Sequence, residues 1–132
     1  MNWRETLTQA RDEGFDVLDW LSARDDDGTV TVVACLVRSD DPAATRIASA
    51  TAPVPSVADM FRSADWHERE TAEMFGIEFT GCADPRPLLL PEGARPPLRK
   101  EYPLAARLDE WPGAVDPAKP RRSQSPPGTP WQ

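Results

Sequence analysis

Prolines confine regular secondary structure to about the first eighty residues of this chain. Six of the fifteen prolines fall between positions 85 and 103. Proline lacks an amide hydrogen and clashes with the preceding helical turn, so it is excluded from helix interiors and from central strands. The stretch from Thr80 to Leu104 is therefore predicted to be extended, and its Leu88-Leu89-Leu90 run indicates that it lies along another surface. Residues 105–132 hold six more prolines and are expected to be a disordered or loosely held tail.

Three strands are predicted upstream of this extended stretch. Residues 15–22 and 29–38 are rich in β-prone side chains, and Asp27-Gly28 between them is a strong hairpin-turn signal. The nearly continuous apolar content of residues 29–38 is typical of a central strand covered on both faces. Residues 45–51 predict a third strand, although their two alanines also suit a helix.

Capping signals predict one helix at the N-terminus and two in the centre of the chain. Asn2 suits the N-cap of a helix that ends at Gly14 and carries an apolar stripe of Trp3, Leu7 and Ala10. Ser56 and Asp59 have capping-box spacing at the start of a short helix, and Asp65 and Glu68 have the same spacing at the start of the next. The latter helix is predicted from Trp66 to about Phe75, before Gly76. The fold class is thus α/β (α+β): a small sheet, an N-terminal helix, two central helices and an extended Pro-rich segment.

The composition favours one soluble, intracellular domain followed by a tail. A length of 132 residues allows a single modest core, and a net charge of −7 argues against free nucleic-acid binding. The acidic excess lies in the first third, where the run Asp25 to Asp27 is interpreted as a solvated, acidic turn. No signal peptide is recognised, and no apolar run approaches the roughly twenty residues of a spanning helix. Two cysteines are too few for a disulfide framework, and Cys35 is expected to be a small core residue.

The sequence contains no complete catalytic, metal-binding or nucleotide-binding motif. His67-Glu68 begins a helical zinc motif, but the second histidine is replaced by Thr71, and His67 is the only histidine. Two cysteines do not supply the thiolates of an iron–sulfur cluster, and the scattered glycines form no phosphate loop. Nucleophilic catalysis by Cys82 with His67 is an alternative that lacks a third, orienting group. We therefore expect no catalytic, cofactor-binding or metal-binding residue on this chain.

The charged helix has two interpretations. Glu68, Arg69, Glu70 and Glu73 could form a solvated, salt-bridged surface whose helical pairs contribute about 0.2–0.5 kcal/mol each. They could instead be buried by a partner, where removal of one member of a pair costs about 3–5 kcal/mol. Composition alone favours the solvated surface. Arg99-Lys100 raises the same question, and Arg86 suits bidentate pairing with a carboxylate of a partner.

An ordered series of motifs within residues 53–104 resembles the C subunit of NADH-quinone oxidoreductase, the thirty-kilodalton-subunit family of respiratory complex I. The motifs are Pro55-Ser56, Ala64-Asp65-Trp66-His67-Glu68-Arg69-Glu70, Met74-Phe75-Gly76-Ile77, Phe79, Gly81, Asp84, Arg86, Leu88-Leu89-Leu90-Pro91 and Pro97-Leu98-Arg99-Lys100-Glu101-Tyr102-Pro103-Leu104. Residues 3–52 resemble the family only in outline. The resulting organisation is an N-terminal α/β portion (1–52), a signature region (53–104) and a tail (105–132).

The resemblance implies a cofactor-free α/β subunit of the hydrophilic arm, with no active site of its own. Such a chain would brace the D-type (forty-nine-kilodalton) and B-type subunits at the cytoplasmic side of a bacterial membrane, as a peripheral part of the complex. NADH, FMN, iron–sulfur clusters and quinone would be bound by partner subunits. The resemblance also reverses the preference above and favours interface charges. The expected interface residues are Trp66, Glu68, Arg69, Glu70, Glu73, Phe75, Gly76, Arg86, Leu98, Arg99, Lys100 and Tyr102.

Three departures from the family pattern bear on which complex this chain belongs to. Cys82 stands where the family usually has histidine, Pro87 stands where it has a second arginine, and the stretch between Pro91 and Pro97 is shorter and lacks a tryptophan. They leave open an alternative parent assembly, a membrane-bound [NiFe]-hydrogenase or a related ferredoxin-linked complex. A free-standing enzyme that uses Cys82 or the glutamate cluster is the rival from another class.

Overall fold

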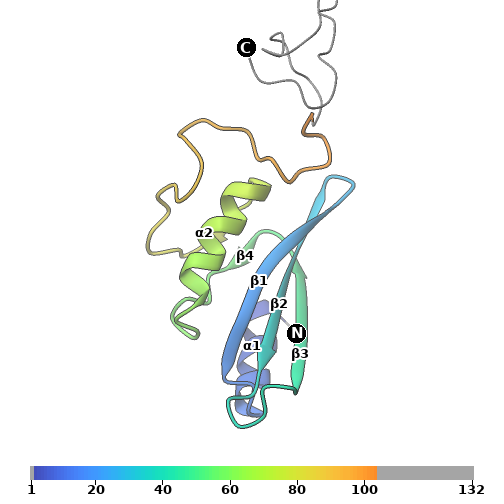
Figure 1. The fold of residues 1–132 in the computed structure, drawn as a ribbon, viewed down its shortest axis with the longest axis vertical. Helices are drawn as coiled ribbons and strands as arrows, with labels where there is room; N and C mark the ends of the chain where they lie inside the picture. The colour runs from blue at the N-terminus through green and yellow to red at the C-terminus, as the bar shows by residue number, and fades with distance from the viewer. Residues whose placement is uncertain (1, 104–132) are drawn as a thin grey trace, which may run out of the picture. The chain divides into compact units, whose positions relative to one another are not determined.

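The computed structural model describes residues 2–103, which form two helices, a three-stranded sheet and a short two-stranded sheet (Figure 1). The elements in chain order are α1 (Trp3–Asp12), β1 (Val17–Asp26), β2 (Thr29–Val37), β3 (Thr45–Thr51), β4 (Val54–Pro55), α2 (Ala64–Phe75) and β5 (Phe79–Thr80). The predicted α/β class is confirmed. The predicted tail lies outside the described residues, and the division at residue 52 stays a prediction. Within residues 2–103, no helix has the length and apolarity needed to cross a membrane.

Helix α1 begins as the sequence predicts. The Asn2 side chain accepts the Glu5 amide at 2.9 Å, and the Glu5 carboxylate accepts the Asn2 amide at 3.1 Å, which completes a capping box. Trp3, Leu7 and Ala10 are the buried residues of the helix, at the spacing of one helical face. This face fixes α1 against the sheet.

The three long strands form an antiparallel sheet in the order β1-β2-β3, which confirms β2 as the central strand. The expected cover on both faces is wrong for the described residues, which place the core on one face of β2 only. Asp26 pairs with Thr29, so the loop between β1 and β2 consists of Asp27 (φ 53°) and Gly28 (φ 98°), both left-handed, as the favoured hairpin turn requires. Strand β1 extends four residues beyond its predicted end at Ser22, because β2 pairs with it up to the turn. Residues 45–51 form a strand, not a helix.

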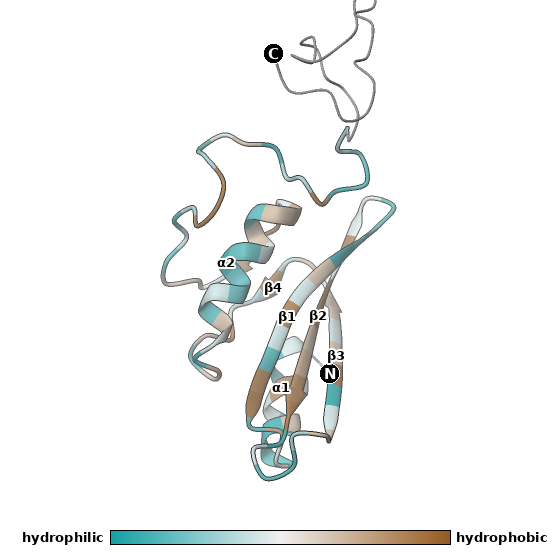
Figure 2. Ribbon diagram, in the orientation of Figure 1, coloured by the Kyte–Doolittle hydropathy of each residue, from teal (hydrophilic) through white to brown (hydrophobic). Residues whose placement is uncertain are grey.

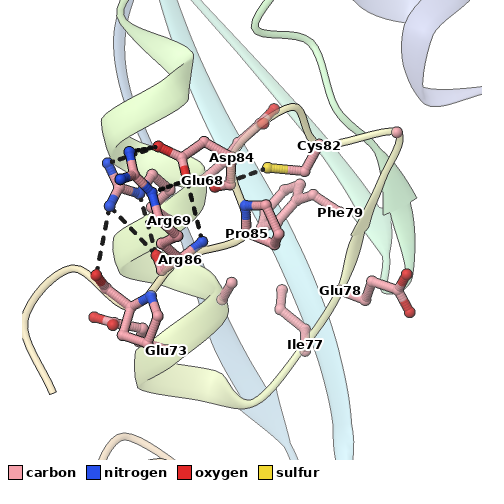
Figure 3. A pocket seen from close by; sticks show the side chains of 13 residues that line it. Glu68, Arg69, Glu73, Ile77, Glu78, Phe79, Cys82, Asp84, Pro85 and Arg86 are labelled. Carbon is pink, nitrogen blue, oxygen red and sulfur yellow. Dashed lines mark hydrogen bonds and ion pairs between the residues drawn. The ribbon is translucent and has the colours of Figure 1, made fainter. Parts of the chain in front are cut away.

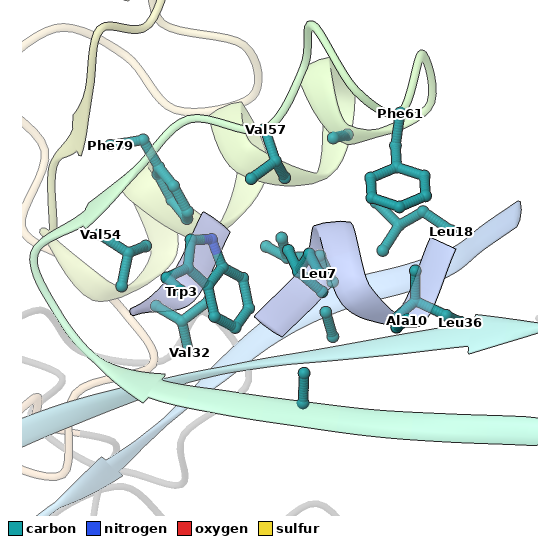
Figure 4. Packing of buried hydrophobic residues seen from close by; sticks show 14 residues of the cluster. Trp3, Leu7, Ala10, Leu18, Val32, Leu36, Val54, Val57, Phe61 and Phe79 are labelled. Atoms are coloured by element: carbon teal, nitrogen blue, oxygen red, sulfur yellow. The ribbon is translucent and has the colours of Figure 1, made fainter. Parts of the chain in front are cut away.

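The hydrophobic core lies on one face of this sheet (Figure 4). Val32, Ala34 and Leu36 of β2 alternate toward α1, and Leu18 and Leu21 of β1 share their side of the sheet. The stretch from β4 to the first residue of α2 closes the core with Val54, Val57, Phe61 and Ala64. Trp3 is 5% exposed, and its indole Nε1 has no hydrogen-bond partner within residues 2–103.

The segment between Ser56 and Ser63 corrects one prediction, because it forms turns and not a short helix. The residues of the supposed capping box have other partners: the Ser56 hydroxyl donates to Glu68, and Asp59 forms a bidentate pair with Arg4 at 2.7 and 2.8 Å. Arg4 also donates to the Ser56 carbonyl at 2.6 Å. Tertiary contacts therefore outweigh the local capping pattern here.

Helix α2 also starts differently from the prediction. It begins at Ala64, and Ser63 at its N-cap makes no side-chain capping bond. The Asp65–Glu68 capping box does not form, because the Glu68 carboxylate is used inside the chain. The end of the helix agrees with the prediction: Gly76 adopts a left-handed conformation (φ 64°, ψ 40°).

Candidate functional site

The candidate site is the extended segment of residues 81–103, called the strip from here on, together with the side chains that fasten it to α2 and to the β1–β2 hairpin. The strip contains no helix or strand within the described residues. Its backbone amides and carbonyls therefore need partners elsewhere. Charged side chains supply several of these partners: Arg69 and Glu73 of α2, and Asp25 of the hairpin.

Glu73 fastens the leucine run of the strip to α2. Its carboxylate accepts the amide of Leu88 through Oε1 and the amide of Leu89 through Oε2, the latter at 2.8 Å. The amide of Leu98 donates to the carbonyl of Met74 at 3.0 Å, so a second point of the strip meets the end of the same helix. This docking agrees with the prediction that the leucine run lies along another surface.

Arg69 fastens the segment that precedes the leucine run (Figure 3). Its guanidinium donates to the carbonyl of Arg86 at 3.3 and 3.4 Å and to the carbonyl of Pro87 at 3.5 Å, and lies 3.7 Å from the carboxylate of Asp84. It also lies over the Trp66 ring, 5.3 Å from the centroid. The Arg69 side chain is only 11% exposed. An arginine–glutamate pair with Glu73 is absent from the described ion pairs, because both side chains bind the strip instead.

Arg86 pairs with a carboxylate of the same chain, that of Asp84. Its Nε and Nη2 atoms donate to the two oxygens of Asp84 at 2.7 and 2.8 Å, in the bidentate geometry that the sequence suggested for a partner carboxylate. This bond, assisted by the charge of Arg69, holds the pKa of Asp84 well below its usual range. The Arg86 side chain remains 79% exposed.

Asp25 fastens the other end of the strip to the hairpin. Its carboxylate accepts the amide of Lys100 at 2.9 Å and the amide of Gly28 at 2.8 Å, and Arg99 lies at 3.5 Å. The backbone bond from Lys100 is the largest cause of the lowered pKa of Asp25, followed by the bond from Gly28. The expectation of a wholly solvated acidic turn is therefore wrong for Asp25, which is 8% exposed. Asp27 remains exposed and pairs with the Lys100 ammonium at 3.1 Å.

Glu68 lies inside the chain. It is 1% exposed, and its carboxylate accepts the Ser56 hydroxyl at 2.6 Å and the Val57 amide at 2.7 Å. Burial raises the pKa of Glu68, and the two hydrogen bonds oppose that rise. The expectation that Glu68 faces a partner is corrected, because its contacts tie α2 to the segment after β4.

A hollow of about 460 Å³ lies between α2 and the strip (Figure 3). Its polar lining includes Glu68, Arg69, Glu73, Asp84 and Arg86, the residues whose mutual and backbone bonds are described above. The Cys82 thiol, also in the lining, contacts the carbonyl of Asp84 at 3.4 Å. Residues 2–103 contain no cluster of three or more histidine, cysteine or acidic side chains arranged to hold a metal ion. The arrangement is suited to fastening backbone segments.

The expected interface residues fall into three groups by exposure. Glu68 and Phe75 are buried within the chain and present no surface to a partner, which corrects their assignment. Arg69, Glu73, Arg99 and Tyr102 are half-buried. Trp66, Glu70, Gly76, Arg86, Leu98 and Lys100 are exposed. The role of the exposed and half-buried residues in an interface stays a prediction.

Sequence reasoning missed several of the hydrogen-bond partners in this site. Asp25 reads as one member of an acidic run, and its pairing with an amide 75 residues away leaves no local pattern. Ser56 is interpreted from the sequence as a helix cap, although its hydroxyl donates a hydrogen bond to the Glu68 carboxylate. Asp84 offered one usable signal, its position two residues before Arg86.

Comparison with known proteins identifies relatives of this sequence. The sequence model of the family described as "Respiratory-chain NADH dehydrogenase, 30 Kd subunit" matches residues 1–108. The chain is 53% identical over 53 residues to the NAD(P)H-quinone oxidoreductase subunit J of Synechococcus sp. (strain CC9902), a match that covers 39% of this chain and 28% of the relative. The protein of the same description from Prochlorococcus marinus (strain MIT 9211) is 56% identical over 50 residues, which cover 37% of this chain and 28% of the relative. The matched segment thus spans under a third of the length of these relatives.

Proposed function

Because the chain belongs to the family of the 30 kDa subunit of respiratory-chain NADH dehydrogenase, we propose that it is a non-catalytic core subunit of the hydrophilic arm of an NADH-quinone oxidoreductase. In this role it braces the D-type and B-type subunits. The description of its relatives as subunits of an NAD(P)H-quinone oxidoreductase supports this assignment.

The observation that carries the proposal is that charged residues of α2 and of the β1–β2 hairpin bind backbone groups of the same chain. Glu73, Arg69 and Asp25 bind the backbone of the strip at both ends, and Glu68 binds the backbone before α2. These bonds fix an irregular segment in one conformation, which is what a rigid docking surface needs.

The outer side of this fastened region supplies the proposed contacts. Trp66 and Leu98 are 61% and 55% exposed, and Glu70 is exposed on the same helix as Trp66. Exposed tryptophans are frequent energetic centres of protein interfaces. NADH, FMN, iron–sulfur clusters and quinone are proposed to be bound by partner subunits, and the assembly to lie at the cytoplasmic side of a bacterial membrane.

The test is purification of the assembly from the native host through a tag on this chain, followed by native mass spectrometry. The proposal expects a D-type and a B-type subunit in the purified assembly. Trp66→Ser and Glu70→Lys should reduce recovery of the D-type subunit about tenfold or more, whereas Asp12→Lys on exposed α1 should not. Arg99→Ala should also weaken association, but through release of the strip from Asp25. A chain recovered alone, or turnover of a substrate by the isolated chain, would overturn the proposal.

The hydrogenase-type assembly is the second candidate, supported by the departures at Cys82 and Pro87. Both positions lie in the strip and both line the hollow beside α2. The same purification separates the candidates. A large subunit that keeps its nickel-binding cysteines would identify the hydrogenase-type complex, and a large subunit without them would identify the quinone oxidoreductase.

A further inference from the structure

One face of the three-stranded sheet carries an apolar patch that the described residues do not cover. We call it the open sheet face and define it by the outward side chains of Val17, Trp20, Val33, Cys35, Val37 and Ile47. The core lies on the opposite face, with α1 behind the sheet in the view of Figure 1. Figure 2 shows hydrophobic segments gathered along the strands of this sheet.

The pairing register brings the patch together. Trp20 pairs with Cys35, and Cys35 pairs with Ile47, so the three side chains form a row across β1, β2 and β3. Cys35 in the middle is 5% exposed, but its neighbours Trp20 and Ile47 are 39% and 57% exposed, and Val17 is 40% exposed. A contiguous exposed apolar patch of this kind is typical of an interaction surface.

The β3 edge of the sheet extends this surface. Strand β3 pairs with β2 along its whole length without a bulge, and within residues 2–103 no strand pairs with its other edge. Its sequence, from Thr45 to Thr51, contains no proline, lysine or acidic residue that would discourage pairing. Its one charge, Arg46, is engaged by Glu13 and lies 4.8 Å from the centroid of the Phe15 ring.

One charge borders the patch. Asp19 lies at the irregularity in β1 between Leu18 and Trp20, is exposed, and forms no ion pair or side-chain hydrogen bond with the described residues. It precedes Trp20, the β1 member of the row, and burial together with the negative charge of Asp19 raises the pKa of the Cys35 thiol. The open sheet face is therefore apolar with one unpaired carboxylate.

We propose that the open sheet face is a second docking surface, which binds a partner subunit through an apolar segment with a lysine or arginine opposite Asp19. This inference rests on the proposed function and adds a contact on the side of the sheet remote from α1. Charge complementarity identifies the occupant: a basic group offsets Asp19, whereas a second copy of this chain, with a net charge of −7, brings like charges together.

The experiment compares the tagged assembly with the purified full-length chain by hydrogen exchange, and adds three variants. Protection of β3 amides should rise at least about tenfold in the assembly relative to the monomeric chain. Asp19→Lys and Ile47→Asp should each reduce the recovered assembly about tenfold, with unchanged circular dichroism of the free chain. Asp12→Lys makes the same charge change as Asp19→Lys on α1, behind the sheet, and should leave recovery unchanged.

Each contrary outcome has its own signature. If the assembly forms and β3 exchanges as fast as in the free chain, the open sheet face is not a docking surface, although the proposed function stands. If β3 is already protected in the monomer and becomes unprotected when residues 104–132 are removed, the chain covers its own face. Protection that depends on the concentration of the free chain identifies a second copy. These last two results also overturn the inference, and a chain recovered without any partner overturns the proposed function itself.

Discussion

Replacement of Glu68 tests the view that signature charges hold this chain together. The carboxylate is 1% exposed and accepts two hydrogen bonds, from the Ser56 hydroxyl and the Val57 amide. Glu68→Ala leaves both donors without this acceptor, and each unsatisfied buried donor costs about 1–3 kcal/mol. With the volume emptied beside α2, we expect a loss of about 3–5 kcal/mol in the free energy of unfolding.

Glu68→Gln separates the hydrogen bonds from the charge. The glutamine carbonyl can accept the Val57 amide, and its amide group can donate to the Ser56 oxygen. It also removes a charge whose burial is unfavourable, so we expect a change within about 1 kcal/mol at neutral pH. The exposed Glu70 offers a matched control on the same helix, where Glu70→Ala should change stability by less than about 0.5 kcal/mol.

Urea unfolding followed by tryptophan fluorescence and circular dichroism measures these free energies. Comparison of Glu68→Ala with Glu70→Ala decides the question. Equal, small losses in the two variants would show that Glu68 is not a buried acceptor, and would refute the fastening role assigned to it. A loss in Glu68→Gln as large as that in Glu68→Ala would show that the charge itself is required.

The pH dependence of the Glu68 effect has a definite sign. Burial raises the pKa of Glu68 above its ordinary value of 4.5, so the folded chain keeps this proton to a higher pH than the unfolded chain does. The stability that it contributes is fully present below the unfolded-state pKa and is lost as the pH rises through the folded-state pKa. The wild type should therefore lose stability relative to Glu68→Gln as the pH rises above the ordinary glutamate pKa of 4.5 and through the higher folded-state pKa. A difference that is constant across this range contradicts the buried position.

Three further predictions concern the strip. Glu73→Gln should speed hydrogen exchange of the Leu88 and Leu89 amides about tenfold or more, with little effect on the sheet. Unchanged exchange of these amides would contradict the role of Glu73 in holding the strip. Gly76→Ala should cost at least about 1 kcal/mol in urea unfolding, since alanine disfavours a φ of 64° and its Cβ would lie 2.6 Å from the Pro96 Cγ; a neutral result contradicts this close approach. Because the pKa values of Asp25 and Asp84 are lowered in the folded chain, the stability that these carboxylates contribute is present above about pH 4 and is lost as the pH falls through their folded-state pKa values. Strip amides that stay protected from exchange in acid would contradict this prediction.

Local patterns predicted the elements whose stability is local. The Asn2 cap, the Asp27-Gly28 turn and the Gly76 helix end each depend on residues within a few positions of one another, and all three form as predicted. The predicted helix after Ser56 fails for the opposite reason. Its capping residues are taken by Glu68 and Arg4, which are distant in sequence.

The sequence identified residues of the candidate site, but it did not identify the groups that they bind. The sequence singles out Arg69, Glu73 and Arg99 as functional charges, and the structure shows that each binds a backbone group or carboxylate of the same chain. No periodicity reports such pairings, because the strip has no regular structure and its partners lie 15 to 75 residues away. Six exposed residues remain the part of the predicted interface that is fully available to a partner: Trp66, Glu70, Gly76, Arg86, Leu98 and Lys100.

The carboxylate of Asp25 serves two distant segments at once, since it closes the hairpin turn through Gly28 and anchors the strip through Lys100. Exposed hairpin tips usually accept inserted residues without harm to the rest of a domain. In this chain an insertion between Asp27 and Gly28 would move the Gly28 amide and reorient Asp25, and so detach a segment more than seventy positions downstream. The tip of this hairpin is therefore a poor place for a tag or a label, however accessible it looks.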